Sequence, residues 1–149
     1  MTLPAGLRAA RLSRRLASGL YEALIVLALV FIATLPFSYL FGDATHGWKR
    51  HLLQAWVLAV TAAYFAWFWT RGGQTLPMKT WRLRLVAADG GPVAVQRALR
   101  RFLIALLGFA AMGLGFLWAF VDRDRQVLHD RLSGTLLVET SAAGGTASL

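Results

Sequence analysis

The sequence predicts an all-α transmembrane protein with about three membrane-spanning helices and a small amphipathic or β-hairpin element in a cytoplasmic loop. Composition is the first reason: 57% of the 149 residues are hydrophobic and only 15% are charged, with a mean hydropathy of +0.54. A typical soluble domain has about 25% charged residues. The second reason is that the apolar residues gather into three long stretches, and the third is a basic balance of 16 Lys and Arg against 7 acidic residues.

The three apolar stretches cover residues 20–41, 52–70 and 102–121. About 20 apolar residues cross a hydrocarbon core about 30 Å thick, so each stretch is long enough for one span. A buried helix of a soluble bundle would have a polar face, and none of the three has one. We therefore expect a transmembrane domain over residues 14–139, preceded by a basic segment at 1–13 and followed by a disordered tail at 140–149.

Basic residues flank the apolar stretches unevenly. Four precede the first stretch and seven lie between the second and third, whereas only two lie between the first and second. Cytoplasmic loops carry an excess of Lys and Arg, which places the N-terminus and the second loop in the cytoplasm, against anionic lipid headgroups. Because the arginines flank spans and do not line one soluble face, the charge does not indicate a nucleic-acid partner.

The side of the C-terminal segment depends on the third stretch. Three full spans place the residues after 121 on the far side of the membrane from the N-terminus, and this is the arrangement we expect. The alternative starts from residues 135–139, a strand-like run that could pair with residues 82–86 on the cytoplasmic side. The third stretch would then turn back near residues 113–115, although each half would be only about 15 Å long.

The second loop and the stretches themselves carry further local signals. Alternating apolar and basic residues at 81–85 predict a strand, the Asp89-Gly90 step predicts a tight turn, and residues 92–95 could return as the second strand of a hairpin. Small residues repeat at every fourth position and predict close helix packing: Ala55, Ala59 and Ala63 in the second stretch, and Ala111, Gly115 and Ala119 in the third. Aromatic residues near the ends of these stretches are typical of interfacial belts: Tyr64, Phe65, Trp67, Phe68, Trp69, Phe116, Trp118 and Phe120.

Charged residues at an apolar stretch need a partner, because an unpaired charge inside lipid is costly. Glu22 lies near the start of the first stretch, seven residues after Arg15 and therefore on the same helix face. It could bind a proton or a cation, or it could lie at the interface and pair with an arginine, which is the arrangement we favour. We expect Asp130 to join these two residues in one polar cluster.

Catalytic and metal-binding patterns are weak in this sequence. The chain has no cysteine, and its three histidines do not have the spacing of a compact metal site. Ser133 lies near His129 but outside a nucleophile-elbow context. We expect no enzyme activity, no metal site and no cofactor.

Three motifs around the apolar stretches carry a family resemblance. The first runs from Arg15 to Glu22, the second is Gly73-Gln74-Thr75 followed by Lys79, and the third runs from Leu128 to Thr135. Together they span nearly the whole chain and resemble the RDD family of membrane proteins. Arg15 and Asp130 match the family's arginine and one of its aspartates, whereas Glu22 stands where the family has an aspartate inside the first helix. Pro77-Met78 stands where the family often has a glycine before the lysine.

The resemblance also implies which residues matter for function. These are Arg15, Glu22 and Asp130, with a secondary set of Gly73, Gln74, Thr75, Lys79, His129, Gly134 and Thr135. It implies a multi-pass bacterial inner-membrane protein with a cytoplasmic N-terminus and a largely undefined molecular function. Transport of unknown ligands is suggested for the family, and cation/proton antiport for some members.

Two functions remain open at this point. Transport of a ligand or an ion would need a homo-oligomer or a membrane-protein partner, because three spans are too few to enclose a pathway. The alternative is a non-catalytic interaction or assembly protein that packs against partner helices through its alanine stripes.

Overall fold

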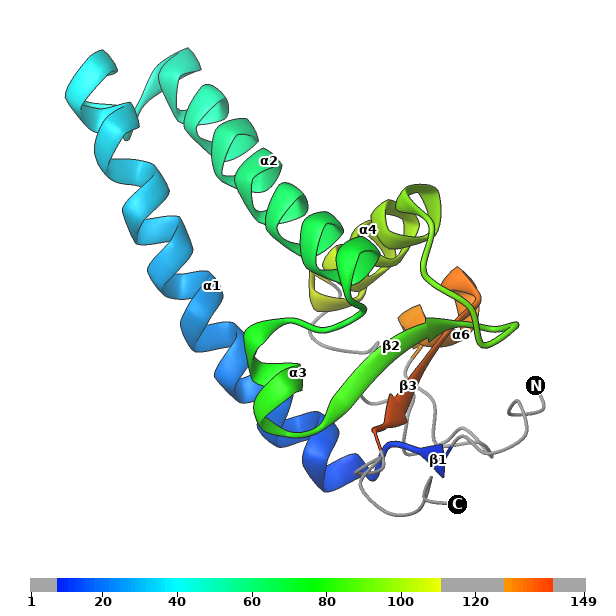
Figure 1. The fold of residues 1–149 in the computed structure, drawn as a ribbon. Coiled ribbons are helices and arrows are strands. Elements are labelled where there is room, and N and C mark those ends of the chain that lie inside the picture. Colours follow the sequence, from blue (N-terminus) through cyan, green and yellow to red (C-terminus); the bar gives the residue numbers. More distant parts are fainter. Residues whose placement is uncertain (1–7, 111–127, 141–149) are drawn as a thin grey trace, which may run out of the picture.

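The structure is a computed structural model that describes residues 8–110 and 128–140. Two long helices form a hairpin that projects from a base of one small sheet and shorter helices (Figure 1). In chain order the elements are β1 (Arg8–Ala9), α1 (Leu12–Phe41), α2 (Gly47–Arg71), α3 (Leu76–Thr80), β2 (Leu83–Ala87), α4 (Val95–Ala110), α6 (Leu128–Ser133) and β3 (Thr135–Glu139).

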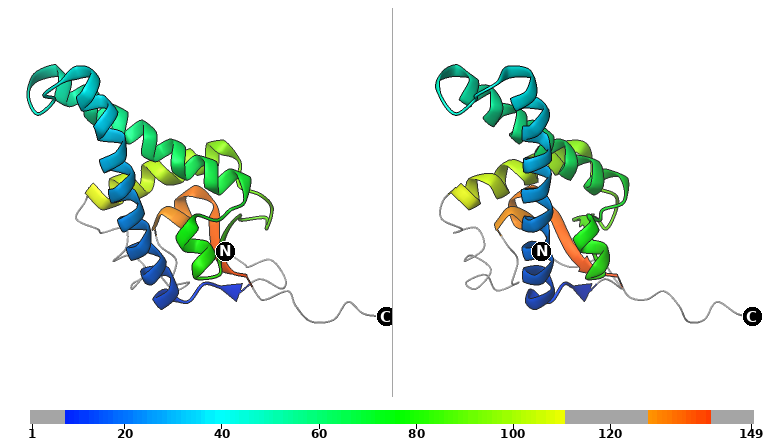
Figure 2. Two further views of the ribbon diagram at one scale, coloured as in Figure 1. Left: turned by 60° about the vertical axis from the view of Figure 1, so that its left-hand side comes forward. Right: turned by 90° about the vertical axis from the view of Figure 1, so that its left-hand side faces the viewer.

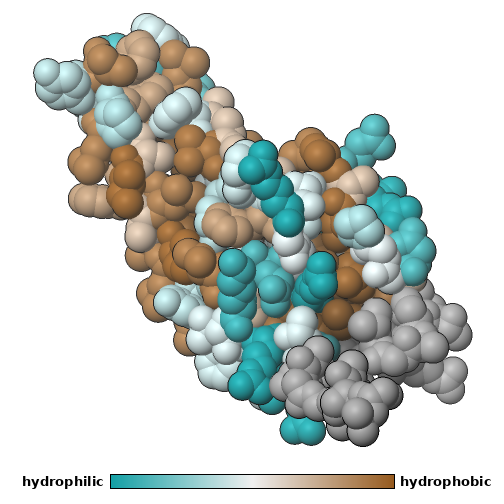
Figure 3. All heavy atoms as spheres, viewed as in Figure 1, coloured by the Kyte–Doolittle hydropathy of each residue, from teal (hydrophilic) through white to brown (hydrophobic). Residues whose placement is uncertain are grey.

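Helices α1 and α2 correspond to the first two predicted spans. With 30 and 25 residues, they are about 45 and 38 Å long, more than the hydrocarbon thickness of a bilayer. Both are long and apolar enough to cross a membrane. Large apolar side chains such as Leu24, Phe31 and Leu40 stay exposed along the hairpin, and its surface is predominantly hydrophobic (Figure 3). This exposure is expected of helices that face lipid.

The tip of the hairpin is closed by local hydrogen bonds. Gly42 ends α1 with a φ of 68°, which glycine adopts readily, and its N–H donates to the carbonyl of Ser38 at 2.9 Å. Lower down, the indole Nε1 of Trp56 in α2 donates to the carbonyl of Ala33 in α1 at 2.9 Å. Pro36 has no N–H to donate to the carbonyl of Ile32, the residue before Ala33, so the helical bonding is interrupted next to the carbonyl that Trp56 contacts.

The base holds a three-stranded antiparallel sheet in the order β1-β3-β2. In the register of β2 with β3, Leu83 pairs with Glu139 and Ala87 pairs with Thr135. The predicted strand at residues 81–85 is thus confirmed, with bounds shifted by two residues. The predicted hairpin partner at residues 92–95 is wrong, because Val95 begins α4 and β2 pairs with β3 instead.

The turn after β2 follows the expected chemistry although it does not make a hairpin. Gly90 has a φ of 84°, and its N–H donates to the carbonyl of Ala87 at 2.8 Å. The N–H of Gly91 donates to the carboxylate of Asp89 at 3.0 Å, which lowers the pKa of that carboxyl below its ordinary value. The turn therefore leads the chain from β2 into α4.

The sheet overturns the expected position of the C-terminal segment. Strand β1 precedes α1, β2 follows α2, and β3 lies near the C-terminus, yet all three are hydrogen-bonded neighbours. Neighbouring strands cannot lie on opposite faces of a bilayer. The expectation that the segment after residue 121 lies across the membrane from the N-terminal segment is therefore wrong for residues 135–139, and their alternative pairing with the strand after α2 is confirmed.

Part of the third predicted span is a helix, but the rest cannot be compared with the structure. Helix α4 includes residues 102–110 and crosses close to the base of α2 (Figure 2). Residues 111–121 lie outside the described residues, and with them Ala111, Gly115, Ala119 and the aromatics of that stretch. The segments 1–7 and 141–149 lie outside them as well, so the predicted disordered tail is untested.

The core of the base lies where α2, α4 and the sheet meet. Leu83, Leu85 and Ala98 are completely or almost completely shielded from solvent, at 0–1% exposure. The other buried members of this cluster are Ala10, Trp69, Met78, Val93, Phe102 and Leu137. The alanine stripe of α2 contributes elsewhere: Ala55 and Ala59 line a shallow groove that Leu99 and Leu103 of α4 border.

Candidate functional site

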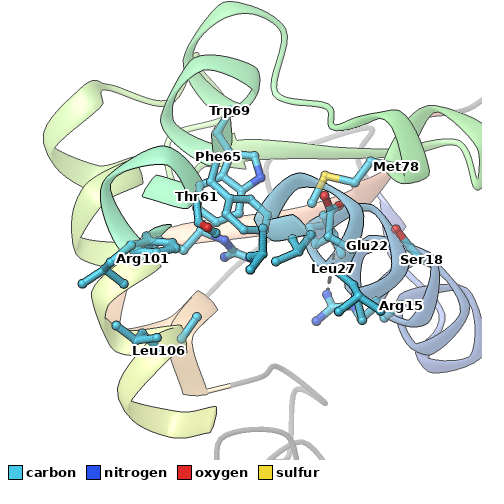
Figure 4. Close-up of a pocket in the computed structure, with 18 of the residues that line it drawn as sticks. Arg15, Ser18, Glu22, Leu27, Thr61, Phe65, Trp69, Met78, Arg101 and Leu106 are labelled. Carbon is cyan, nitrogen blue, oxygen red and sulfur yellow. Dashed lines mark hydrogen bonds between the residues drawn. The ribbon is translucent and has the colours of Figure 1, made fainter. Parts of the chain in front are cut away.

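A cavity of about 760 Å³ lies between α1, α2 and α4, above the sheet. Figure 4 shows Arg15, Ser18 and Glu22 on the α1 side, with Phe65 and Trp69 of α2 across from them. The cavity is polar at the end near the sheet and apolar along the hairpin. Its lining is formed by Arg15, Ser18, Gly19, Glu22, Ala23, Val26, Leu27, Val30, Gln54, Val57, Leu58, Thr61, Phe65, Trp69, Met78, Arg101, Phe102, Ala105, Leu106, Asp130 and Leu137.

Asp130 is the centre of the polar end. It is 1% exposed and accepts a bond from Nη1 of Arg15 on Oδ2 at 3.0 Å. Its other oxygen, Oδ1, accepts a bond from Nη1 of Arg101. Both arginine side chains are also buried, at 7% and 5% exposure, so these ion pairs are shielded from water. Arg15 and Asp130, two of the three residues expected to share a polar cluster, therefore form an ion pair in the structure.

Arg15 also joins the start of α1 to the sheet. Its Nε donates to the carbonyl of Ala10 at 3.1 Å, and its Nη2 donates to the carbonyl of Leu137 at 3.1 Å. With the Asp130 bond, one guanidinium thus ties the chain just before α1 to α6 and β3, which lie more than 110 residues later. The planar, forked donor set of arginine suits this task, which a lysine could not perform.

The third motif folds around Asp130. Thr135 is fully buried, and its hydroxyl contacts Nη1 of Arg101 at 2.8 Å and Oγ of Ser133 at 2.7 Å. Gly134 links α6 to β3 with a φ of 64°, a conformation that side-chain-bearing residues rarely adopt. His129 lies within α6. The motif therefore orients the carboxylate of Asp130 and leads the chain into β3.

Glu22 lies along the same cavity with different partners from those expected. Its Oε1 accepts the hydroxyl of Tyr64 at 2.9 Å, and its Oε2 accepts the hydroxyl of Thr75 at 2.5 Å. The favoured pairing with an arginine is thus replaced by two hydroxyl donors. Arg15, Glu22 and Asp130 all line this cavity, but of the three only Arg15 and Asp130 contact each other directly, so the expected cluster forms only in part.

The second motif connects α2 to the sheet. The carbonyl of Gly73 accepts the N–H of Leu85 at 2.6 Å, and Nε2 of Gln74 donates to the carbonyl of Leu83 at 2.6 Å. These bonds cover the outer edge of β2, and Thr75 then reaches Glu22. Lys79, in the last turn of α3, is exposed and lies outside the cavity lining.

Gly73 is needed for this connection. Its φ is 67°, and a Cβ there would lie 2.4 Å from the carbonyl oxygen of Leu85. The second motif thus needs glycine at this position because the backbone of β2 approaches it closely.

Sequence reasoning missed three residues of the site: Tyr64, Trp69 and Arg101. Tyr64 and Trp69 were interpreted as part of an interfacial belt, which fits the exposed Trp67 under Arg71 but not the 5% exposed Trp69. Arg101 was counted only as a topology signal. Arg101 directly precedes the third apolar stretch, and this position could have indicated that its side chain needs a buried acidic partner.

Two buried donors in the cavity wall lack an acceptor within the part of the chain that the structure describes. They are Nε1 of Trp69 and Nε of Arg101. The two side chains are neighbours, since Cζ of Arg101 lies 5.1 Å from the centroid of the Trp69 ring. Buried N–H groups almost always have a partner in native proteins. These two N–H groups could therefore donate to an oxygen atom of a ligand bound in the cavity.

Comparisons with known proteins agree with the motifs. No curated protein and no solved structure matched the chain. The model of the RDD family matches residues 9–134, which include α1, α2, all of the cavity lining except Leu137, and most of the third motif. This match covers far more than half of the sequence, and the chain belongs to the RDD family.

Proposed function

We propose that this protein binds a small molecule in the cavity between α1, α2 and α4 and takes part in moving it across the membrane. One observation carries the proposal: the charged residues Arg15, Glu22 and Asp130, which come from two distant motifs, line one cavity whose other walls are mainly apolar. A volume of about 760 Å³ falls in the range of small-molecule sites, roughly 300–1,000 Å³. Close helix packing alone would not require such a space.

The proposed role is binding and passage without catalysis, and it needs neither a metal nor a cofactor. The polar groups at the sheet end of the cavity hold one another in place, as the Arg15–Asp130–Arg101 bonds illustrate. Such a site orients a ligand through fixed donors and a shaped wall. Two candidate spans cannot enclose a pathway alone, so the proposal includes a second copy or another membrane protein as partner.

The proposed membrane arrangement has α1 and α2 as spans and the sheet base on the cytoplasmic side of a bacterial inner membrane. Charge supports this orientation. Between Arg8 and Arg101, only Lys49 and Arg50 lie at the far end of the hairpin, whereas the other Lys and Arg residues lie toward the base. The positive-inside rule places the more basic end in the cytoplasm, where the base also meets anionic headgroups.

The orientation can be tested directly because the chain has no cysteine. Thr45→Cys places a thiol at the hairpin tip, and Thr140→Cys places one directly after β3. In intact spheroplasts, a membrane-impermeant maleimide should label Thr45→Cys at once and Thr140→Cys only after lysis. Labelling of both variants before lysis would contradict the two-span arrangement.

Ligand binding can be tested without knowing the ligand. The protein is extracted from membranes with a styrene–maleic acid copolymer, and the masses that it retains are measured by native mass spectrometry. We expect a small-molecule adduct on the wild type that is lost in Ala105→Trp, where the new ring fills the cavity. The control Ala63→Trp adds the same ring at an exposed position outside the cavity lining and should keep the adduct.

A role in assembly is the second candidate, and one observation favours it. The groove that Ala55 and Ala59 form with Leu99 and Leu103 is apolar and lined partly by small residues, which lets another helix approach closely. The same extraction separates the two functions. A protein partner in fixed ratio, with no small-molecule adduct on the wild type, would support assembly and overturn the ligand-binding proposal.

A further inference from the structure

We infer that the cavity is built for an amphiphile with one hydrocarbon chain and an acidic headgroup, either a carboxylate or a phosphate. The inference rests on the proposed function, because the ligand would occupy the same cavity. The headgroup oxygens would accept the N–H groups of Trp69 and Arg101, and the chain would extend between α1 and α2. Three independent features of the lining lead to this assignment.

The first feature is the pair of buried donors. Trp69 and Arg101 are 5% and 4% exposed, and neither Nε1 of Trp69 nor Nε of Arg101 has an acceptor among the described residues. They come from different helices, α2 and α4, and the guanidinium lies 5.1 Å from the indole ring centroid. A headgroup with two or more oxygens can accept both bonds at once, which a single hydroxyl ligand would do less well.

The second feature is the charge of the polar end. Among the described residues that line it, Arg15 and Arg101 share the single carboxylate of Asp130. The carboxylate of Glu22 is held on both oxygens by the hydroxyls of Tyr64 and Thr75. Both carboxylates of the polar end thus already have partners, and the groups left over are two N–H donors, one of them on a cation. An acidic headgroup offers acceptors for these donors, whereas a trimethylammonium headgroup offers none.

The third feature is the apolar wall that leads away from these donors. Val26 and Val30 of α1 face the cavity together with Val57 of α2. Leu27 and Leu58 also line it, and they are 67% and 40% exposed. The cavity therefore opens to the outer surface of the hairpin, where an amphiphile could enter sideways from the bilayer with its chain still in apolar surroundings.

The test compares three probes on the purified full-length protein in neutral maltoside micelles. Dodecyl phosphate carries the chain and the acid, dodecyltrimethylammonium carries the chain and the opposite charge, and inorganic phosphate carries only the acid. Native mass spectrometry at increasing probe concentration gives the dissociation constant of each. We expect dodecyl phosphate to bind at least 10-fold more tightly than either of the other two probes.

Two variants show where the headgroup lies. Trp69→Phe keeps an aromatic ring and removes the N–H donor, so it should weaken dodecyl phosphate binding roughly 10- to 100-fold. Trp67→Phe makes the same change two residues earlier, at an exposed ring outside the cavity lining, and should have no effect. If Trp69→Phe does not fold, Ala105→Trp serves instead, because it blocks the cavity and should abolish binding.

The possible failures are distinguishable. Equal binding of the two dodecyl probes, or equal binding of inorganic phosphate, would overturn the inference. So would unchanged dodecyl phosphate binding to Trp69→Phe or Ala105→Trp. If the wild type still retains an adduct that Ala105→Trp loses, the cavity binds a different ligand and the proposed function stands. If the extracted wild type retains no adduct, the proposed function itself fails.

Discussion

Replacing Asp130 with asparagine should destabilise the protein strongly. The substitution keeps the size of the side chain but removes the negative charge between Arg15 and Arg101, whose side chains are only 7% and 5% exposed. Removing one partner of a buried ion pair costs about 3–5 kcal/mol, because the remaining charge stays buried without compensation. For a chain of this size, 1 kcal/mol corresponds to about 2–4 °C in Tm, so the expected decrease is roughly 6–20 °C.

The assay is thermal unfolding of the detergent-solubilised protein, followed by circular dichroism. Asp89→Asn is the matched control, because Asp89 also contacts an arginine, Arg97, at 3.6 Å. That carboxylate is 67% exposed, so solvent screens the pair and the control should melt like the wild type. The reasoning is refuted if Asp130→Asn and Asp89→Asn have the same Tm. The fold would then not need the negative charge of Asp130 to compensate the buried charges of Arg15 and Arg101.

Three further substitutions test other contacts of the base and the hairpin. Gly73→Ala should lower the Tm because its Cβ would lie 2.4 Å from a carbonyl of β2, while the neighbouring Gly72→Ala, with open space around it, should not. Glu22→Gln should retain more folded protein in the membrane than Glu22→Ala, measured by fluorescence-detected size exclusion, because the amide oxygen still accepts a hydroxyl. Trp56→Phe should cost about 1 kcal/mol of unfolding free energy, read from thermal unfolding, because the bond to Ala33 is lost.

Each of these expectations has a contrary outcome. Equal Tm values for the two glycine variants would mean that the Gly73 backbone can move away from β2. Equal yields of Glu22→Gln and Glu22→Ala would mean that the hydroxyl contacts to Glu22 do not support folding. A wild-type Tm for Trp56→Phe would mean that the indole bond adds nothing to the packing of α1 on α2.

Local properties of the sequence were enough to predict the helical hairpin and two of the three strands, β2 and β3, but not β1. About twenty apolar residues in a row can satisfy their backbone groups in lipid only as a helix, so the stretches that became α1 and α2 were readable from composition alone. The alternation of apolar and basic residues marked β2 in the same way. A cluster of Arg15, Glu22 and Asp130 was expected from the shared helix face of the first two and from a family resemblance, since nothing local relates Arg15 to a residue 115 positions away.

The tertiary structure decided which elements meet. The turn at Asp89-Gly90 was chemically correct, but turn chemistry does not choose a strand's partner, and β2 paired with β3 about 50 residues away. In the same sheet, β3 lies beside β1 near the N-terminus. The count of basic residues had been compatible with either side of the membrane for this C-terminal strand. The packing of α4 against α6 brought Arg101 to Asp130, and the packing of α1 against α2 and the segment after it brought Glu22 to two hydroxyl groups. The physical reason is that spans and strands arise from short-range backbone and hydrophobic rules, while a buried charge takes its partners from whatever the folded chain brings within hydrogen-bond reach.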